Sequence, residues 1–237
     1  PVSSPWFTKS VLDSGLPVLV APMSTPAGQS LWAAPSVTVV VMVGVGSKHE
    51  PSERAGISHF LEHFVFKGTE KFPASSDVLR ALDALGADHN AATGKEATAY
   101  WVKVARESLP RALEVLGDVV FRPRLPEELL VLEKGTIIQE IAMYEDQPSA
   151  KVGRNFEEML LGKDTRLGRE IIGTRETVSS VTRDDLVRYR EKWYQPKRMV
   201  VGVAGGVQEK EVVSLIEQHF RFKKAESVKR KALSGKM

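Results

Sequence analysis

Apolar residues follow two different patterns along this chain, and each pattern predicts a different kind of secondary-structure element. The run 37–43 is β-branched and almost wholly apolar, which predicts a central strand buried on both faces. Two short apolar runs around a Ser-Gly turn predict a hairpin over 11–20. Further strands are expected at 87–94, as a loop and edge strand, and at 98–104 and 199–204.

Helical periodicity fills much of the remaining sequence, and capping residues mark several helix ends. Gly86 is placed to close one helix as a C-cap, and Thr182 is placed to open another. Because strands and helices mix irregularly, the sequence predicts the α+β class, with one mainly antiparallel sheet covered by helices. The expected helices cover 77–85, 107–120, 127–144, 150–161, 182–193 and 208–220, and another follows Gly56.

Composition narrows the possible classes of function. The 237 residues are 42% hydrophobic and 27% charged, which suits one large globular domain or two small ones. The net charge is only +3, and the basic residues are scattered until the C-terminal tail, so no nucleic-acid partner is indicated. The absence of cysteine excludes a disulfide framework and thiol chemistry.

Membrane and targeting signals are weak in this sequence. No apolar run reaches the ~18 residues that a membrane-spanning helix requires, so no membrane span is expected. No signal peptide is visible, and the expected location is the cytoplasm. A chain that begins at Pro1 leaves a removed leader open as an alternative.

The stretch 56–69 holds three polar side chains at helical spacing. His59 and His63 are four residues apart, and Glu62 follows His59 by three, so a helix presents all three on one face. Their neighbours are apolar, and burying polar groups without partners is costly. Two imidazoles and a carboxylate can hold a zinc ion and a water beside a base. The same spacing also fits two helical histidines that only form hydrogen bonds.

A matching acid lies far downstream of this stretch. Glu140 follows His63 with 76 residues between them, and Glu133 lies seven residues earlier, two turns up the same predicted helix. The pattern His-x-x-Glu-His, followed by glutamates at these intervals, resembles the M16 peptidases. That family includes pitrilysin, the insulin-degrading enzymes and the mitochondrial processing peptidases. The absence of cysteine argues against the lyase LuxS, which carries a similar helix.

The resemblance implies a zinc site in which each residue has a role. His59, His63 and Glu140 would be the three metal ligands, which leaves a fourth position for water. Glu62 would be the general base, and would therefore stay free of the metal. Glu133 would lie behind the metal and orient a histidine or the water. Spacing alone fits equally well a Glu133 that is a surface residue on an amphipathic helix.

The resemblance also assigns substrate binding to the expected edge strand. The family's edge strand takes up an extended or unfolded peptide as an added strand, and an ordinary exposed edge is the alternative. The segment that resembles it consists of Asn90, Ala91, Ala92 and Thr93. Lys95 and Glu96, just after it, are expected to be a solvated pair. The remaining histidines, His49, His89 and His219, are expected to be surface or structural residues.

The expected organisation is a peptidase domain over 1–222 and a basic linker or tail over 223–237. Family enzymes have two homologous halves around a chamber, and this chain resembles the first half. A second half or subunit, in a homo- or heterodimer, is therefore the expected partner; truncation, cleavage and a natural short subunit all stay open as the origin of a single half. The expected function is a Zn²⁺-dependent endopeptidase acting on extended peptides. The alternatives are a precursor-processing peptidase and a non-catalytic structural subunit.

Overall fold

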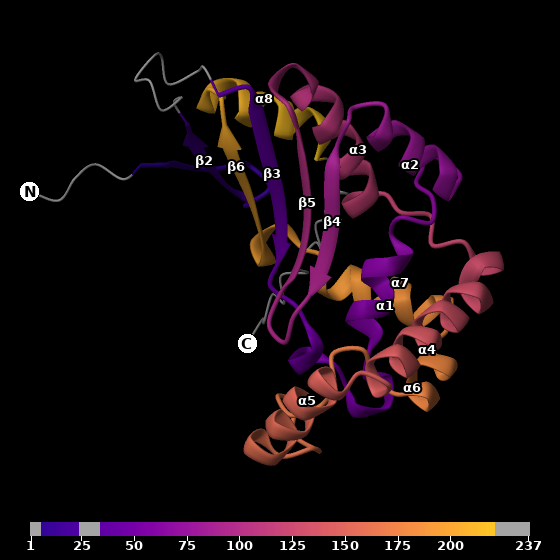
Figure 1. The fold of residues 1–237 in the computed structure, drawn as a ribbon. Coiled ribbons are helices and arrows are strands. Elements are labelled where there is room, and N and C mark those ends of the chain that lie inside the picture. Colours follow the sequence, from indigo (N-terminus) through magenta and orange to yellow (C-terminus); the bar gives the residue numbers. More distant parts are fainter. Residues whose placement is uncertain (1–5, 24–33, 221–237) are drawn as a thin grey trace, which may run out of the picture.

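Six strands form one mixed sheet in the computed structural model, which describes residues 6–23 and 34–220 (Figure 1). They are β1 (Thr8–Val11), β2 (Pro17–Pro22), β3 (Ser36–Val43), β4 (Asp88–Thr93), β5 (Thr98–Ala105) and β6 (Met199–Gly205). The strand order is β1-β2-β6-β3-β5-β4, so β4 lies at one edge. β2 and β6 run parallel, and the other neighbouring strands are antiparallel. This sheet confirms the predicted fold class.

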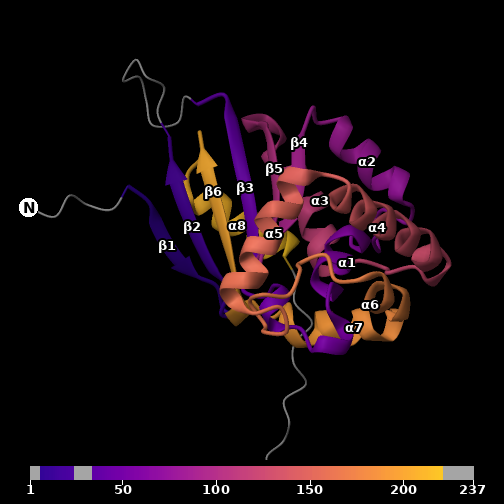
Figure 2. The same ribbon diagram turned by 60° about the horizontal axis from the view of Figure 1, so that its bottom comes forward.

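Eight α-helices lie within the described residues. They are α1 (Ile57–Phe64), α2 (Ser75–Asp83), α3 (Leu109–Phe121), α4 (Leu130–Glu145), α5 (Pro148–Leu161), α6 (Arg175–Ser180), α7 (Arg183–Trp193) and α8 (Glu209–His219). α3 and α8 lie behind the sheet in Figure 1, whereas α1, α4, α6 and α7 gather beyond the end of β4, and Figure 2 shows the same grouping from another side. Across the described ranges, no helix combines the length and the apolar character that crossing a bilayer requires.

The central strand β3 is buried on one face only, which corrects the expectation of burial on both faces. Val39 and Val41 are fully buried, whereas Val40 between them is half-buried and Met42 is 43% exposed. The helices cover the face that carries the odd-numbered residues. An apolar β-branched run therefore predicted a central strand correctly, but it did not distinguish one covered face from two.

Element boundaries differ from the expected ones mainly at helix starts. The helices expected from 107 and from 127 begin at Leu109 and Leu130, each after a short 3₁₀ turn. The hairpin over 11–20 is confirmed by the antiparallel pairing of β1 and β2. The short helix α6 was not predicted. The expected tail over 223–237 lies outside the described residues, so the domain boundary at 222 stays a prediction.

The start of α1 is packed tightly against a distant loop. Gly56 precedes the helix with φ 93°, and a Cβ atom there would lie 2.5 Å from the carbonyl oxygen of Ile172. Gly173 faces it with φ 80°, in the left-handed region that favours glycine. The loop 169–173 therefore lies directly on the N-terminus of the helix that carries His59 and His63.

Candidate metal centre

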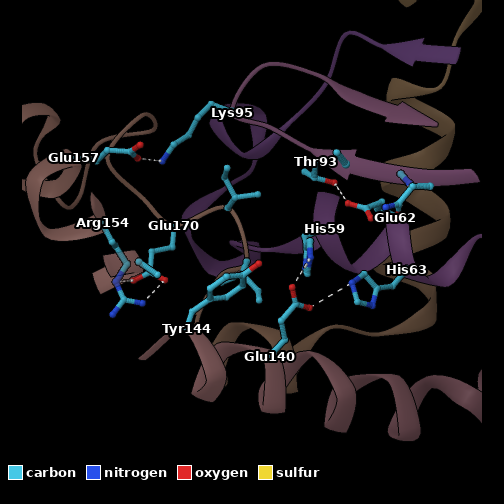
Figure 3. Close-up of a pocket in the computed structure, with 16 residues that line it drawn as sticks. His59, Glu62, His63, Thr93, Lys95, Glu140, Tyr144, Arg154, Glu157 and Glu170 are labelled. Carbon is cyan, nitrogen blue, oxygen red and sulfur yellow. Dashed lines mark hydrogen bonds and ion pairs between the residues drawn. The ribbon is translucent and has the colours of Figure 1, made fainter. Parts of the chain in front are cut away.

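Two helices bring three metal-ligating side chains to one point. His59 and His63 lie one turn apart on α1, and Glu140 projects from α4 toward both imidazole rings (Figure 3). Nε2 of His59 lies 3.7 Å from Oε1 of Glu140, and Nε2 of His63 lies 3.5 Å from Oε2. The candidate ligand atoms of the three residues all lie within 4.8 Å of one another. Residues from segments far apart in the sequence therefore converge as one group.

The geometry of this group and the neutral state of His59 fit a zinc ion. Ligand atoms at 2.0–2.1 Å from a tetrahedral zinc are roughly 3.3 Å apart, close to the 3.7 and 3.5 Å that separate Glu140 from the two histidines. Burial and the neighbouring His63 lower the pKa of His59 to about 3, so His59 is neutral and its lone pair is available near pH 7. Its Nδ1 is buried without a hydrogen-bond partner. A His-His-Glu donor set is one that catalytic zinc sites use.

A carboxylate and an ammonium group support His63 from behind. Nδ1 of His63 lies 2.9 Å from Oε1 of Glu133, and Nζ of Lys67 lies 2.7 Å from Oε2 of the same carboxylate. Glu133 is only 2% exposed. Burial raises the pKa of Glu133, but the hydrogen bonds from His63 and Lys67 outweigh it and leave the pKa lowered. Glu133 is therefore an ionised partner of a candidate ligand and not a surface residue.

Lys67 is a supporting residue that the sequence did not reveal. It follows His63 by four residues, just beyond the end of α1, and its ammonium group is paired with Glu133 on α4. The spacing of four from His63 was visible in the sequence. A lysine near a metal site carries no signal of its own, because its partner lies on a different helix.

Glu62 lies in the same cleft but is not part of the ligand group. Its Oε2 accepts a hydrogen bond from Oγ1 of Thr93 at 2.6 Å, so the edge strand holds this carboxylate in place (Figure 3). Burial, with a contribution from the negative charge of Glu140, raises the pKa of Glu62, although the Thr93 hydroxyl and the neighbouring His63 lower it. A carboxyl group with a raised pKa beside a candidate metal site suits a general base.

The ligand group lies at one end of a cleft of about 620 Å³. The cleft runs along the predicted substrate segment, and all four of its residues line it: Asn90, Ala91, Ala92 and Thr93. Among the described strands, β4 pairs with β5 alone, so its outer edge is open. Oδ1 of Asn90 accepts a hydrogen bond from the N–H of Ala91 at 2.9 Å. Substrate binding by this edge stays a prediction.

The far end of the cleft holds charged pairs that the sequence did not predict. Nζ of Lys95 lies 2.8 Å from the carbonyl oxygen of Arg169 and 3.2 Å from Oε2 of Glu157 on α5. Arg154 on α5 pairs with Glu170 at 3.1 Å (Figure 3). These contacts tie α5 to the turn after β4 and to the loop before α6.

The expectation that Lys95 and Glu96 form a solvated pair was therefore wrong. Lys95 points into the cleft, whereas Glu96 is paired with Lys48. Lys95 and Glu96 follow each other in the bend between β4 and β5, and their side chains have different partners.

The remaining described histidines lie outside the ligand group. The ring of His49 lies 4.9 Å from that of Trp193, and its Nδ1 accepts the N–H of Gly46 at 3.2 Å. His89 lies on β4 but is not among the described residues that line the cleft. His219 ends α8, near Arg122, which donates to its carbonyl oxygen.

Comparison with known protein families shows to which family this chain belongs. Residues 29–175, more than half of the chain, match the family model described as Insulinase (Peptidase family M16). The chain belongs to peptidase family M16. Residues 180–235 of this M16 chain match the model described as Peptidase M16 inactive domain.

Relatives of this M16 chain include proteins named zinc proteases. One from Mycobacterium leprae is 42% identical over 192 residues, which cover 81% of this chain and 43% of the relative. The periplasmic protease PqqL from Escherichia coli is 26% identical with a TM-score of 0.81, over 91% of this chain and 24% of PqqL. Pitrilysin shares the fold, with 24% identity and a TM-score of 0.78 over 90% of this chain and 22% of pitrilysin. The M16 chain thus spans less than half the length of these proteins.

Proposed function

We propose that this chain carries the zinc site of an M16 endopeptidase that hydrolyses extended peptides. The observation that supports the proposal most is the convergence of His59, His63 and Glu140 within 4.8 Å, with Glu62 beside them and outside the group. A non-catalytic structural subunit would have no need of this arrangement. The zinc protease names of the relatives point to the same metal.

The roles of the residues follow from their positions. A bound zinc ion would polarise the substrate carbonyl and lower the pKa of a water molecule to about 7. Glu62 accepts the proton of the attacking water on its free carboxylate oxygen and returns it to the leaving amine. Thr93 holds the other oxygen of Glu62, which fixes the direction of that transfer. Glu133 keeps the ring of His63 in place and its proton on Nδ1.

The open edge of β4 suits an extended peptide as substrate. A peptide that pairs with this edge gains main-chain hydrogen bonds, and its side chains alternate between the cleft and the outside. Asn90 would release the N–H of Ala91 to the incoming strand, since its own side chain occupies that donor. Such binding favours unfolded segments over folded proteins, because only an extended backbone fits beside a strand.

We propose also that a second homologous half or subunit completes the enzyme. The chain covers 43% of its Mycobacterium leprae relative and 24% of PqqL. A substrate chamber built from two halves would leave this chain able to bind zinc but poor in cleavage when alone. A precursor-processing peptidase would use the same site, and the difference between the two enzymes lies in which peptides the closed chamber admits.

The proposal is tested by cleavage of a mixed peptide library, with and without a chelator, by the chain alone and together with a second half supplied from a relative. Cleavage that zinc restores after chelation, and that Glu62→Gln abolishes while zinc stays bound, is the expected result. A wild-type chain that binds no zinc after dialysis against the metal would overturn the proposal. Retained zinc binding without cleavage in any combination would favour the structural subunit.

A further inference from the structure

The helix that carries both histidines starts without a cap of its own. Gly56 stands at the N-cap of α1 with φ 93° and has no side chain to accept a hydrogen bond. Glu50, which lies six residues upstream of Gly56, accepts the hydrogen bonds of this helix start instead. Its Oε2 accepts the N–H of Gly56 at 2.7 Å, and its Oε1 accepts the N–H of Ser58 at 2.8 Å. Each carboxyl oxygen therefore holds one amide of the first helical turn.

Glu50 is deeply buried, although burying a carboxyl group without hydrogen-bond partners destabilises the folded state. Its exposed fraction is 2%. Burial raises the pKa of Glu50 to about 7, while hydrogen bonds from the hydroxyl and amide of Ser58 and from the amide of Gly56 lower it. The Ser58 hydroxyl also lies 2.8 Å from the hydroxyl of Tyr189 on α7. The carboxyl group is thus surrounded by matched donors at the point where α1 begins.

The same residue joins α1 to the wall of the cleft. Nη2 of Arg169 donates to the carbonyl oxygen of Glu50 at 2.9 Å, and the carbonyl oxygen of Arg169 accepts Nζ of Lys95 at 2.8 Å. Arg169 is followed directly by Glu170 and Ile171, which line the cleft opposite β4. Glu50 therefore contacts the start of α1 through its side chain and the cleft wall through its main chain.

We propose that Glu50 is a positioning residue for the zinc site, which fixes the start of α1 and with it His59 and His63 relative to the cleft wall. The inference rests on the proposed zinc function of this site. α1 has eight residues, so a small tilt at its N-terminus displaces both ring nitrogens. Displacements of about 1 Å at a reacting site are enough to reduce rates roughly 10²-fold.

The test is the replacement Glu50→Gln in the 237-residue chain. The amide nitrogen of glutamine would face one of the two N–H groups, so only one of the two hydrogen bonds survives. Zinc affinity, measured by competition with a chromophoric chelator, is expected to fall about tenfold. The visible absorption spectrum of the chain loaded with Co²⁺ is expected to change, because it reports ligand geometry. Glu53→Gln, an exposed glutamate on the same segment, is the matched control and should leave both readouts unchanged.

Two results would overturn the positioning role of Glu50 while leaving the zinc function in place. The first is a folded Glu50→Gln chain with wild-type zinc affinity and cobalt spectrum and only a lower Tm, which would show a purely structural role. The second applies if Glu50→Gln fails to fold. Glu50→Asp then decides, since it keeps the carboxyl group but shortens the side chain, and wild-type zinc affinity in that variant overturns the inference. A wild-type chain that binds neither zinc nor cobalt would instead refute the proposed function.

Discussion

His63 is held from behind by Glu133. Its Nδ1 lies 2.9 Å from Oε1 of Glu133, while its Nε2 faces Glu140 at 3.5 Å. The carboxylate therefore keeps the proton on Nδ1 and leaves the lone pair of Nε2 directed at the candidate metal position. Nζ of Lys67 lies 2.7 Å from the other carboxylate oxygen of Glu133, so Glu133 links the candidate ligand His63 to Lys67.

Replacing Glu133 by glutamine should weaken the metal site without unfolding it. The amide keeps the shape of the side chain but loses the negative charge that His63 and Lys67 share. Because partners behind a ligand typically contribute 10–100-fold to metal affinity, zinc affinity should fall by about that factor. Competition with a chelator measures it. Glu128→Gln, an exposed glutamate just before α4, is the control. Equal affinities in both variants would assign Glu133 to stability alone.

Glu62→Gln should separate metal binding from turnover. The glutamine cannot accept a proton, so the rate of peptide cleavage is expected to fall about 10²–10⁴-fold, while the zinc content after dialysis stays that of the wild type. His63→Ala provides the contrast, because it removes a candidate ligand and should lose the metal itself. Metal analysis and cleavage rates of both variants check the assignment. Full turnover in Glu62→Gln would remove Glu62 from the mechanism.

The local part of the site could be predicted because it depends only on helical spacing. His59, Glu62 and His63 lie on one short helix, and the i, i+3, i+4 rule places them on one face without any knowledge of the fold. Glu140 was found only through its interval, which resembles a family pattern, since no local rule states that α4 packs against α1.

The charged pairs around the site could not be predicted, because each partner comes from a different element. Lys67 belongs to the end of α1 and meets Glu133 on α4, and Lys95 follows β4 and meets Glu157 on α5. Such pairs depend on tertiary packing, and charged residues in a sequence are usually solvated. The same limit applies to β3, whose apolar residues indicate a central strand but not which face the helices cover.

Thr93→Val should shift the pH dependence of activity. Valine keeps the shape of the side chain but removes the hydroxyl that donates to Glu62 at 2.6 Å and lowers its pKa. The pKa of Glu62 should therefore rise further, and because the base must be ionised, the acidic limb of the rate profile should move to higher pH. A pH profile of kcat/KM measures the shift. Thr38→Val on β3 is the matched control, and an unmoved acidic limb in Thr93→Val would contradict the assignment.

Because of Glu50, the free energy of unfolding should fall as the pH rises. Its pKa is about 7 in the folded chain and 4.5 in the reference state, because burial disfavours the charged form. A group whose pKa is raised on folding stabilises the folded chain fully at pH values below its unfolded-state pKa. This stabilisation is lost as the pH rises through the folded-state pKa. Over the window from about pH 4.5 to about 7, the wild type should therefore lose up to roughly 3 kcal/mol of this contribution.

Glutamine at position 50 cannot titrate, so the difference between wild type and Glu50→Gln isolates this effect from the other ionisable groups. The free energy of unfolding of both chains, measured with urea in the presence of a chelator between pH 4.5 and 8, provides the comparison. The advantage of the wild type over the variant should shrink as the pH rises and level off above about pH 7. An advantage that grows with pH would mean that the hydrogen bonds from Ser58 and Gly56 lower the pKa of Glu50 more than burial raises it. Glu50 would then be fully ionised when it caps α1.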